Sequence, residues 1–250
     1  MKKRFRIIKF KKSRPILQVK GLSKSFEGRP ILKKINLDLY PGQVLGLLGP
    51  NGCGKTSLYG CILGRYKVDA GKIFLNQKDI TFSPIHARAK LGIGYLSQYR
   101  SVFSMSTYDN LLAVVELSIK KREKQRSMVE QLLTEFNLQH LRSINANLLS
   151  GGEVRRLQIA RTLVNNPKVI LLDEPMAALD PIVVQDIQKY ILKLQSYGTS
   201  LIITDHVIQN LLQIVDKCVV IGDQTIIAEG KPKEILQSAK ARELYFGSYE

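Results

Sequence analysis

The chain has 250 residues, of which 44% are hydrophobic, so it can bury the core of one large α/β domain or of two small ones. Its apolar runs, such as residues 169–172 and 201–203, are far shorter than the roughly 20 residues that a helix needs to cross a bilayer. We therefore expect a soluble or peripheral protein. The net charge of +17 is uneven, because residues 1–14 carry eight basic side chains and no acidic one.

The basic segment 1–14 has three open interpretations: a solvated extension, an arm that contacts anionic lipid head groups, or an arm that contacts nucleic acid. Since no helix-turn-helix, zinc-finger or stacking-aromatic pattern is present, we expect no nucleic-acid partner. The segment lacks the apolar stretch of a secretory signal, and it is poor in serine for a transit peptide. Three cysteines without a C-x-x-C pair predict neither a zinc site nor a redox motif and indicate a reducing compartment, the cytosol.

Two strand patterns follow the basic segment. Residues 16–20 alternate between apolar and polar side chains, and Ile35, Leu37 and Leu39 repeat this alternation. A turn signal at residues 27–30 separates them. We therefore predict that the protein opens with antiparallel strands.

A glycine-rich loop lies between an apolar strand at 44–48 and a helix predicted over 55–63. It matches the pattern G-x-x-x-x-G-K-[ST], with Gly49, Pro50, Asn51, Gly52, Cys53, Gly54, Lys55 and Thr56, followed by Ser57. Glycines let backbone N–H groups converge on a phosphate, and the positive end of the helix dipole points at the same oxygens. The loop therefore predicts nucleotide binding, with Lys55 at the β- and γ-phosphates and Thr56 as a ligand of Mg²⁺.

The rest of the chain alternates between strand and helix patterns. We predict strands at 72–75, 93–96, 168–172 and 201–204, mostly helical structure over 107–142, helices at 151–164, 182–196 and 207–214, a hairpin over 219–228, and a short helical C-terminus. This alternation predicts a mostly parallel sheet covered by helices.

Two acidic residues, Asp173 and Glu174, end the strand at 168–172. Ligands of α/β folds bind beyond the carboxyl ends of the strands. Asp173 is therefore predicted to hold Mg²⁺ through a water molecule, and Glu174 to accept a proton from an attacking water or to polarise that water.

The segment Leu-Ser-Gly-Gly-Glu at 149–153 begins the helix before this strand. Alone it is typical of a capping box at a helix N-terminus. Together with the glycine-rich loop and the acidic pair it resembles the signature of the ABC ATPases, and the similarity extends over about residues 17–230. It implies a P-loop NTPase fold of the α/β class, with a mostly parallel core sheet, an antiparallel β subdomain and an inserted α-helical subdomain. The implied boundaries are a basic extension at 1–14, the ATPase domain at 15–237 with the helical subdomain at about 99–153, and a short helical tail at 238–250.

The resemblance also assigns roles to single residues. It implies that Phe26, where the family more often has Tyr, stacks on adenine, unless it is a core-facing strand aromatic. Gln98 corresponds to the glutamine that touches Mg²⁺ and relays the nucleotide state to a permease, and His206 to the histidine that contacts the γ-phosphate. Two departures from the family pattern are small, because Cys53 replaces Ala or Ser and Ser57 replaces the usual Thr.

In the family, two subunits enclose two ATP molecules between them. The resemblance implies a homodimer in which Ser150, Gly151 and Gly152 contact the partner's ATP and Asp180 crosses the interface. It further implies two transmembrane permease subunits that dock beside Gln98. The candidate docking residues are Tyr99, Val102, Phe103 and Met105, although ordinary core packing is an alternative for them.

Segments outside the catalytic motifs, at 83–89, 108–114, 227–230 and 243–247, resemble the ATP-binding subunits of lipopolysaccharide exporters. This resemblance implies extraction of lipopolysaccharide from an inner membrane by a cytoplasmic subunit bound peripherally to that membrane. The nearest alternative is the ATPase of a branched-chain amino-acid importer. A soluble ABC protein that acts on ribosomes or DNA would need two ATPase domains or a long coiled-coil insertion, and this chain has neither pattern.

Overall fold

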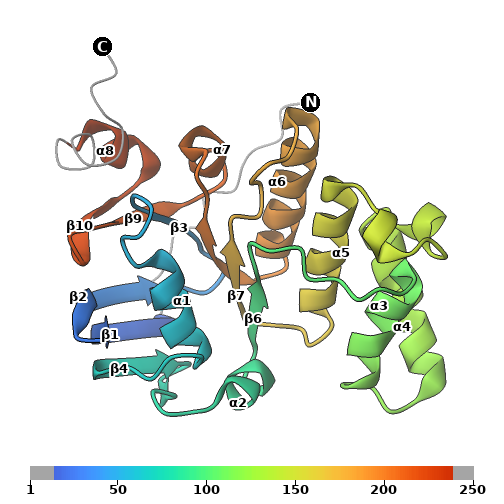
Figure 1. Cartoon of the computed structure of the whole chain (residues 1–250), viewed down its shortest axis with the longest axis horizontal. Coiled ribbons are helices and arrows are strands. Elements are labelled where there is room, and N and C mark those ends of the chain that lie inside the picture. Colours follow the sequence, from blue (N-terminus) through green and yellow to red (C-terminus); the bar gives the residue numbers. More distant parts are fainter. Residues whose placement is uncertain (1–13, 239–250) are drawn as a thin grey trace.

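The computed structural model describes residues 14–238, and Figure 1 shows their arrangement. Nearly all of the basic segment 1–14 and of the predicted helical tail 238–250 lies outside the described residues. Within the described part of the chain, no helix has the length and apolar character that a membrane span requires.

The antiparallel sheet predicted for the start of the chain is present. Its strand order is β2-β1-β4-β5 and all its pairs are antiparallel, with β1 at Leu17–Phe26, β2 at Arg29–Leu39, β4 at Ala70–Leu75 and β5 at Lys78–Asp79. Alternate residues of β1 and β2, such as Val19 and Leu37, are buried beneath this sheet. The alternation of apolar and polar residues therefore correctly predicted that one face of these two strands is buried.

The core sheet is mostly parallel, as predicted. Its strand order is β10-β9-β3-β8-β7-β6, with β3 at Val44–Leu48, β6 at Ile93–Leu96, β7 at Val169–Asp173, β8 at Ser200–Thr204, β9 at Lys217–Gly222 and β10 at Thr225–Gly230. The pairs from β9 to β6 are parallel, and only the hairpin of β9 and β10 is antiparallel.

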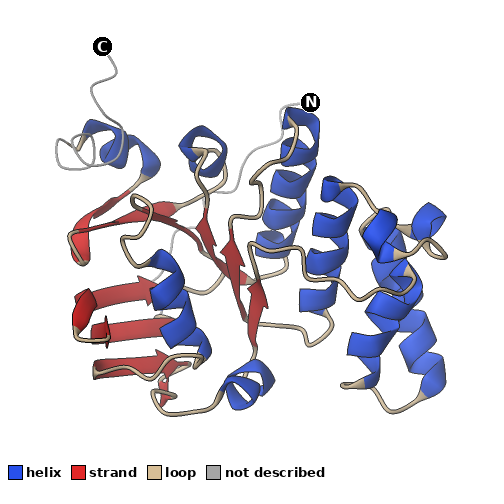
Figure 2. Ribbon diagram, viewed as in Figure 1, coloured by secondary structure: helices blue, strands red, loops and turns tan. Residues whose placement is uncertain are grey.

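Both faces of the central strands are buried, which explains their continuous apolar runs. In β7, Val169 and Leu171 belong to the core shared with the antiparallel sheet, whereas Ile170 and Leu172 belong to the core beneath the larger helices. Helices lie on both sides of this sheet (Figure 2). The helix α1 at Lys55–Leu63 packs in the first core, where nearly all of it is buried.

The segment predicted as helical over 107–142 forms two helices, α3 at Thr107–Glu116 and α4 at Arg122–Glu135. They pack against the second core together with α5 at Gly151–Leu163 and α6 at Pro181–Ser196. The remaining helices are short: α2 at Ile85–Lys90, α7 at Ile208–Leu212 and α8 at Pro232–Gln237, with 3₁₀ turns at Gln139–Leu141 and Ala146–Leu148. The sequence analysis did not predict β5 or α2.

The buried Arg88 of α2 joins this helix to the end of α1. Its side chain is 2% exposed, and its Nη1 donates to the carbonyl oxygens of Cys61 and Ile62 at 2.7 Å each. Nε and Nη2 donate to the carbonyl oxygens of Ser83 and Thr81 at 2.8 Å. Since the last carbonyls of a helix have no partner within it, Arg88 closes the C-terminus of α1 from outside.

We expect Arg88→Met to lower the free energy of unfolding by about 3 kcal/mol, because it leaves the carbonyl oxygens of Ile62 and Thr81 without a donor. Urea denaturation of the isolated chain measures this loss. The control is Lys90→Met on the same helix, where Lys90 is exposed and the change should be within about 0.5 kcal/mol. Equal stabilities of the two variants would contradict this role of Arg88.

Candidate functional site

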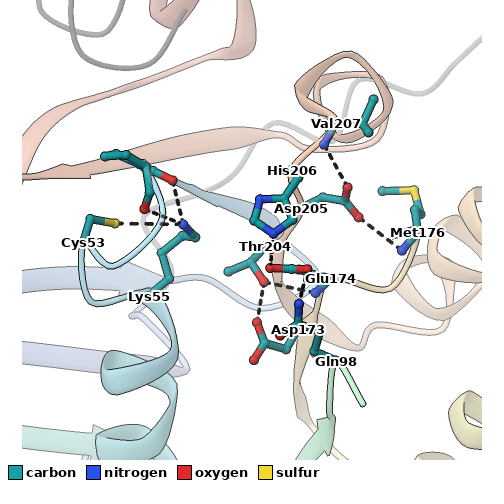
Figure 3. A network of polar contacts seen from close by, with 12 residues as sticks. Cys53, Lys55, Gln98, Asp173, Glu174, Met176, Thr204, Asp205, His206 and Val207 are labelled. Carbon is teal, nitrogen blue, oxygen red and sulfur yellow. Dashed lines mark hydrogen bonds and ion pairs between the residues drawn. The ribbon is translucent and has the colours of Figure 1, made fainter. Parts of the chain in front are cut away.

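Four segments with predicted site residues leave the same edge of the core sheet. The phosphate loop follows β3, Gln98 follows β6, Asp173 ends β7, and His206 follows β8. These strands are parallel neighbours in the order β3-β8-β7-β6, so their carboxyl ends meet. Figure 3 shows Lys55 on one side of this edge and the group around Glu174 on the other.

The phosphate loop requires glycine where the backbone is closest to its neighbours. A Cβ on Gly49, whose φ is 147°, would lie 2.3 Å from the carbonyl oxygen of Ile221. Gly54 has a φ of 108° and precedes α1 without a capping side chain, so the first N–H groups of α1 have no side-chain acceptor there. Lys55 Nζ donates to the carbonyl oxygens of Gly49 and Pro50 at 2.6 and 2.9 Å. The loop thus combines amide donors, a helix N-terminus and an ammonium group, which are the groups that bind phosphate.

The side chains flanking Lys55 differ in exposure. Thr56 is exposed at the start of α1, whereas Cys53 and Ser57 are half-buried. Burial raises the pKa of the Cys53 thiol, although the charge of Lys55 opposes the shift. The thiol is therefore protonated at neutral pH, which slows its reaction with thiol reagents.

Asp173 is 4% exposed, and two hydroxyl groups fix its carboxylate. Thr204 Oγ1 donates to Oδ1 at 2.8 Å, and the Tyr95 hydroxyl donates to Oδ2 at 3.2 Å. Burial raises the pKa of Tyr95 to about 12, and the neighbouring Asp173 adds to the shift, so the phenol stays a donor at neutral pH. Because both oxygens are held from the protein side, the carboxylate has one orientation at the strand end.

Glu174 lies at the centre of the polar network in Figure 3. Its backbone has a φ of 50°, and its N–H donates to the carbonyl oxygen of Thr204 at 3.0 Å. Its carboxylate accepts from Gln98 Nε2 at 2.6 Å and lies 2.6 Å from His206 Nε2. The structure thus brings together the three residues predicted to be catalytic, Gln98, Glu174 and His206.

Burial raises the pKa of the Glu174 carboxyl above its usual range, although His206 attracts the charged form. The nearby Asp173 and Asp205 raise it further. A carboxylate with a raised pKa is a stronger base, so the environment of Glu174 favours proton acceptance. The side chain is 9% exposed, so the carboxylate is largely but not fully shielded from solvent.

The signature segment forms the predicted capping box. Ser150 Oγ accepts from the N–H of Glu153 at 3.4 Å, and Glu153 Oε2 accepts from the N–H of Ser150 at 2.8 Å. Gly151 is exposed, whereas Gly152 is buried and a Cβ there would lie 2.6 Å from Val183 Cγ1 in α6. Figure 1 shows the start of α5 well apart from the start of α1, so these residues do not reach the phosphate loop of their own chain.

The remaining predicted residues lie at the margin of the site. Asp180 is the N-cap of α6, where Oδ1 accepts from the N–H groups of Ile182 and Val183 at 3.0 Å. Phe26 ends β1, is 37% exposed and packs edge-to-face against Tyr66 with the ring centroids 5.0 Å apart. Neither position conflicts with the predicted role.

A groove of about 420 Å³ lies beside the segment that follows β6, between α2 and α5. Its walls include Arg65, Ile85, Tyr95, Ser101 and Arg161. None of the four predicted docking residues is among its walls. Tyr99, Phe103 and Met105 are 78%, 45% and 37% exposed, whereas Val102 packs partly against the second core.

Comparisons with known proteins agree with this geometry. The sequence pattern of the ABC transporter family matches residues 32–177. The chain is 42% identical to the lipopolysaccharide export system ATP-binding protein LptB of Escherichia coli, over 92% of this chain and 97% of that protein. It belongs to the ABC transporter family.

Further relatives place it among the ATP-binding subunits of that family. LptB of Acidithiobacillus ferridurans is 43% identical over 93% of this chain and 97% of that protein. The ADP conformation of MJ1267, an ATP-binding cassette of an ABC transporter, superposes with a TM-score of 0.85 at 30% identity, over 94% of this chain and all of that one. As an ABC ATPase, the chain has the predicted fold and the predicted activity.

Several residues of this ABC ATPase site were missed by the sequence analysis. Tyr95 and Thr204 hold Asp173, and the buried Asp205 accepts from the N–H groups of Met176 and Val207 at 3.1 and 3.0 Å. Arg155 Nη2 donates to the carbonyl oxygens of Gln98 and Glu174 at 3.4 and 3.3 Å. Asp205, beside His206, had a signal in its position after a strand, whereas the bonds of the others depend on contacts between distant segments.

We expect Lys55→Ala to weaken ATP binding roughly ten- to hundredfold, because it removes a charged donor from the phosphate loop. Fluorescence titration with a labelled ATP analogue measures the Kd. The exposed Lys67, outside the loop, serves as the control in Lys67→Ala. An unchanged Kd in Lys55→Ala would refute the role of the loop.

Proposed function

We propose that the chain is the ATPase subunit of a lipopolysaccharide exporter. The proposal rests on one observation: identities of 40–43% over more than nine-tenths of the chain to proteins named for lipopolysaccharide export in several bacteria. The substrate itself would be handled by membrane partners. The chain would supply the energy as a peripheral subunit on the cytoplasmic face of the inner membrane.

In the proposed reaction, a water oxygen attacks the γ-phosphorus of ATP as the bond to the β,γ-bridging oxygen breaks. Glu174 accepts the proton of that water, and the products are ADP and phosphate. Its buried carboxylate and raised pKa support this role. Gln98 and His206, both 2.6 Å from the Glu174 carboxylate, would orient the water and the γ-phosphate.

The residues predicted for Mg²⁺ offer oxygen donors, which this ion prefers. Thr56 has an exposed hydroxyl, Gln98 an amide oxygen, and Asp173 a carboxylate that Tyr95 and Thr204 hold in one orientation. These donors fit the ion, which would neutralise charge on the phosphates when bound. The chain contributes the orientation of these groups.

A homodimer would complete each ATP site. Ser150 and Gly151 are exposed and lie apart from the phosphate loop of their own chain, which supports contact with ATP held by the partner. Gly152 and Asp180 belong to the same proposed interface, although each also has a structural role in its own chain. The domain boundaries predicted from the sequence, including the helical subdomain at about 99–153, form part of this proposal.

Two transmembrane permease subunits would dock at the groove beside the segment after β6, one on each copy of the chain. The exposed side chains of Tyr99, Phe103 and Met105, in the segment that follows β6, support an apolar contact, and Val102 packs partly against the second core. The guanidinium of Arg161 lies 4.5 Å from the Phe103 ring centroid and keeps this ring beside the groove.

We expect Glu174→Gln to bind ATP and to form a stable dimer while losing at least about a hundredfold in hydrolysis rate, because the amide cannot accept the proton. Phosphate release and light scattering with ATP measure the two effects. Glu116→Gln, which changes an exposed glutamate at the end of α3, should behave like the wild type. Hydrolysis at the normal rate in Glu174→Gln would remove Glu174 as the base.

Depletion of the protein in its own cells tests the substrate. We expect lipopolysaccharide to accumulate in the inner membrane and to fall at the cell surface. Fractionation of the two membranes measures both quantities. Normal surface lipopolysaccharide together with failed uptake of branched-chain amino acids would favour the importer instead.

A further inference from the structure

Arg100 crosses from the segment after Gln98 to the loop before the signature. Its Nη2 donates to the carbonyl oxygens of Ala146 at 2.8 Å, Asn147 at 2.9 Å and Leu149 at 3.2 Å. Leu149 directly precedes Ser150, the N-cap of α5. No carboxylate of the described residues forms an ion pair with Arg100, so its charge is directed only at main-chain oxygens.

The backbone on either side of Arg100 is fixed to α5 itself. Arg155 Nη1 donates to the carbonyl oxygen of Ser97 at 3.0 Å, Gln158 Nε2 to that of Tyr99 at 2.9 Å, and Arg161 Nη1 to that of Ser101 at 2.7 Å. These three side chains are spaced three residues apart on one helix, so they form a row that follows the segment. Residues 97–101 and α5 therefore form one connected unit.

The same unit contacts the hydrolytic site. Gln98 donates to Glu174 Oε2 at 2.6 Å, only two residues before Arg100. Arg155 also donates to the carbonyl oxygen of Glu174 at 3.3 Å. Glu174, Gln98, the backbone of residues 98–100, the Arg100 guanidinium and the carbonyl of Leu149 are thus linked by consecutive contacts.

We propose that Arg100 is a positioning residue that couples the ATP site of its own chain to the ATP site completed by its Ser150 in the partner. This inference rests on the proposed sandwich dimer. Arg100 holds the carbonyl oxygens of the loop 146–149 and so fixes where Ser150 and the first N–H groups of α5 stand. Binding at one site then favours closure at the other, which is positive coupling between two sites.

A purely structural role makes a different prediction. If Arg100 only stabilised its loop, its loss would lower thermal stability and leave the ATP-driven association unchanged. If it couples the two sites, its loss leaves the monomer's affinity for ATP intact and weakens the ATP-driven association. The two effects can be measured separately.

The experiment uses the full chain carrying Glu174→Gln, with Arg100→Ala, Arg100→Lys or Arg142→Ala added. Arg142 is the matched control, since it is an arginine of the predicted helical subdomain that pairs with Glu130 at 3.1 Å rather than with loop 146–149. Analytical ultracentrifugation over a series of ATP concentrations gives the concentration for half-maximal dimer. A labelled ATP analogue at low protein concentration gives the monomer's Kd.

We expect Arg100→Ala to raise the ATP concentration for half-maximal dimer about tenfold, with an unchanged monomer Kd. Arg100→Lys, which keeps a charged donor, should recover most of the association, and Arg142→Ala should match the parent. The inference is overturned if Arg100→Ala dimerises like the parent, if its monomer Kd rises with the loss, or if Arg142→Ala loses as much. A parent that forms no dimer with ATP overturns the proposed sandwich dimer, and the inference with it.

Discussion

The burial of β3, β7 and β8 on both faces is the constraint on which the rest of the structure depends. Successive side chains of these strands enter different cores, so that Leu171 and Ile202 pack toward α1 while Ile170 and Ile203 pack toward the larger helices. A shift of one residue would exchange these two sets of side chains. The packing that builds both cores therefore also fixes where each strand ends. It thereby sets the position of Asp173 and Glu174, along the strand direction, relative to the phosphate loop.

Polar groups at these strand ends complete what the packing begins. Buried carboxylates are costly unless they are hydrogen-bonded, and here Tyr95, Thr204, Gln98 and His206 supply the partners. The partners come from β6, β8 and the segments that follow them, so the site forms only when the sheet is complete. The resulting rigidity suits a reaction in which positioning of the phosphates and the water supplies most of the catalysis.

Much of the fold and of the candidate site could be predicted from the sequence, because the phosphate loop, the acidic strand end and the signature are local patterns. The helix α2 was missed because six residues are too few to show a repeating helical pattern of apolar side chains. In addition, the residue that α2 buries is Arg88, whose charge predicts exposure. The roles of Arg155 and Thr204 were missed for another reason. Their partners lie 19 to 58 residues away, and no local spacing encodes such contacts. Val102 shows the same limit, since packing rather than pattern decides its exposure.

Gly152 shows how one position can serve two requirements. A side chain there would meet Val183 within 2.6 Å, so α5 and α6 approach each other closely only because this residue has none. The glycine would therefore be retained during evolution even in a relative that no longer bound nucleotide at the signature. Its invariance among related chains would be weak evidence for ATP contact. Gly151 is exposed, and a Cβ there would meet only Leu179, at 3.3 Å. Conservation of Gly151 would therefore be better evidence of selection for ATP contact than conservation of Gly152.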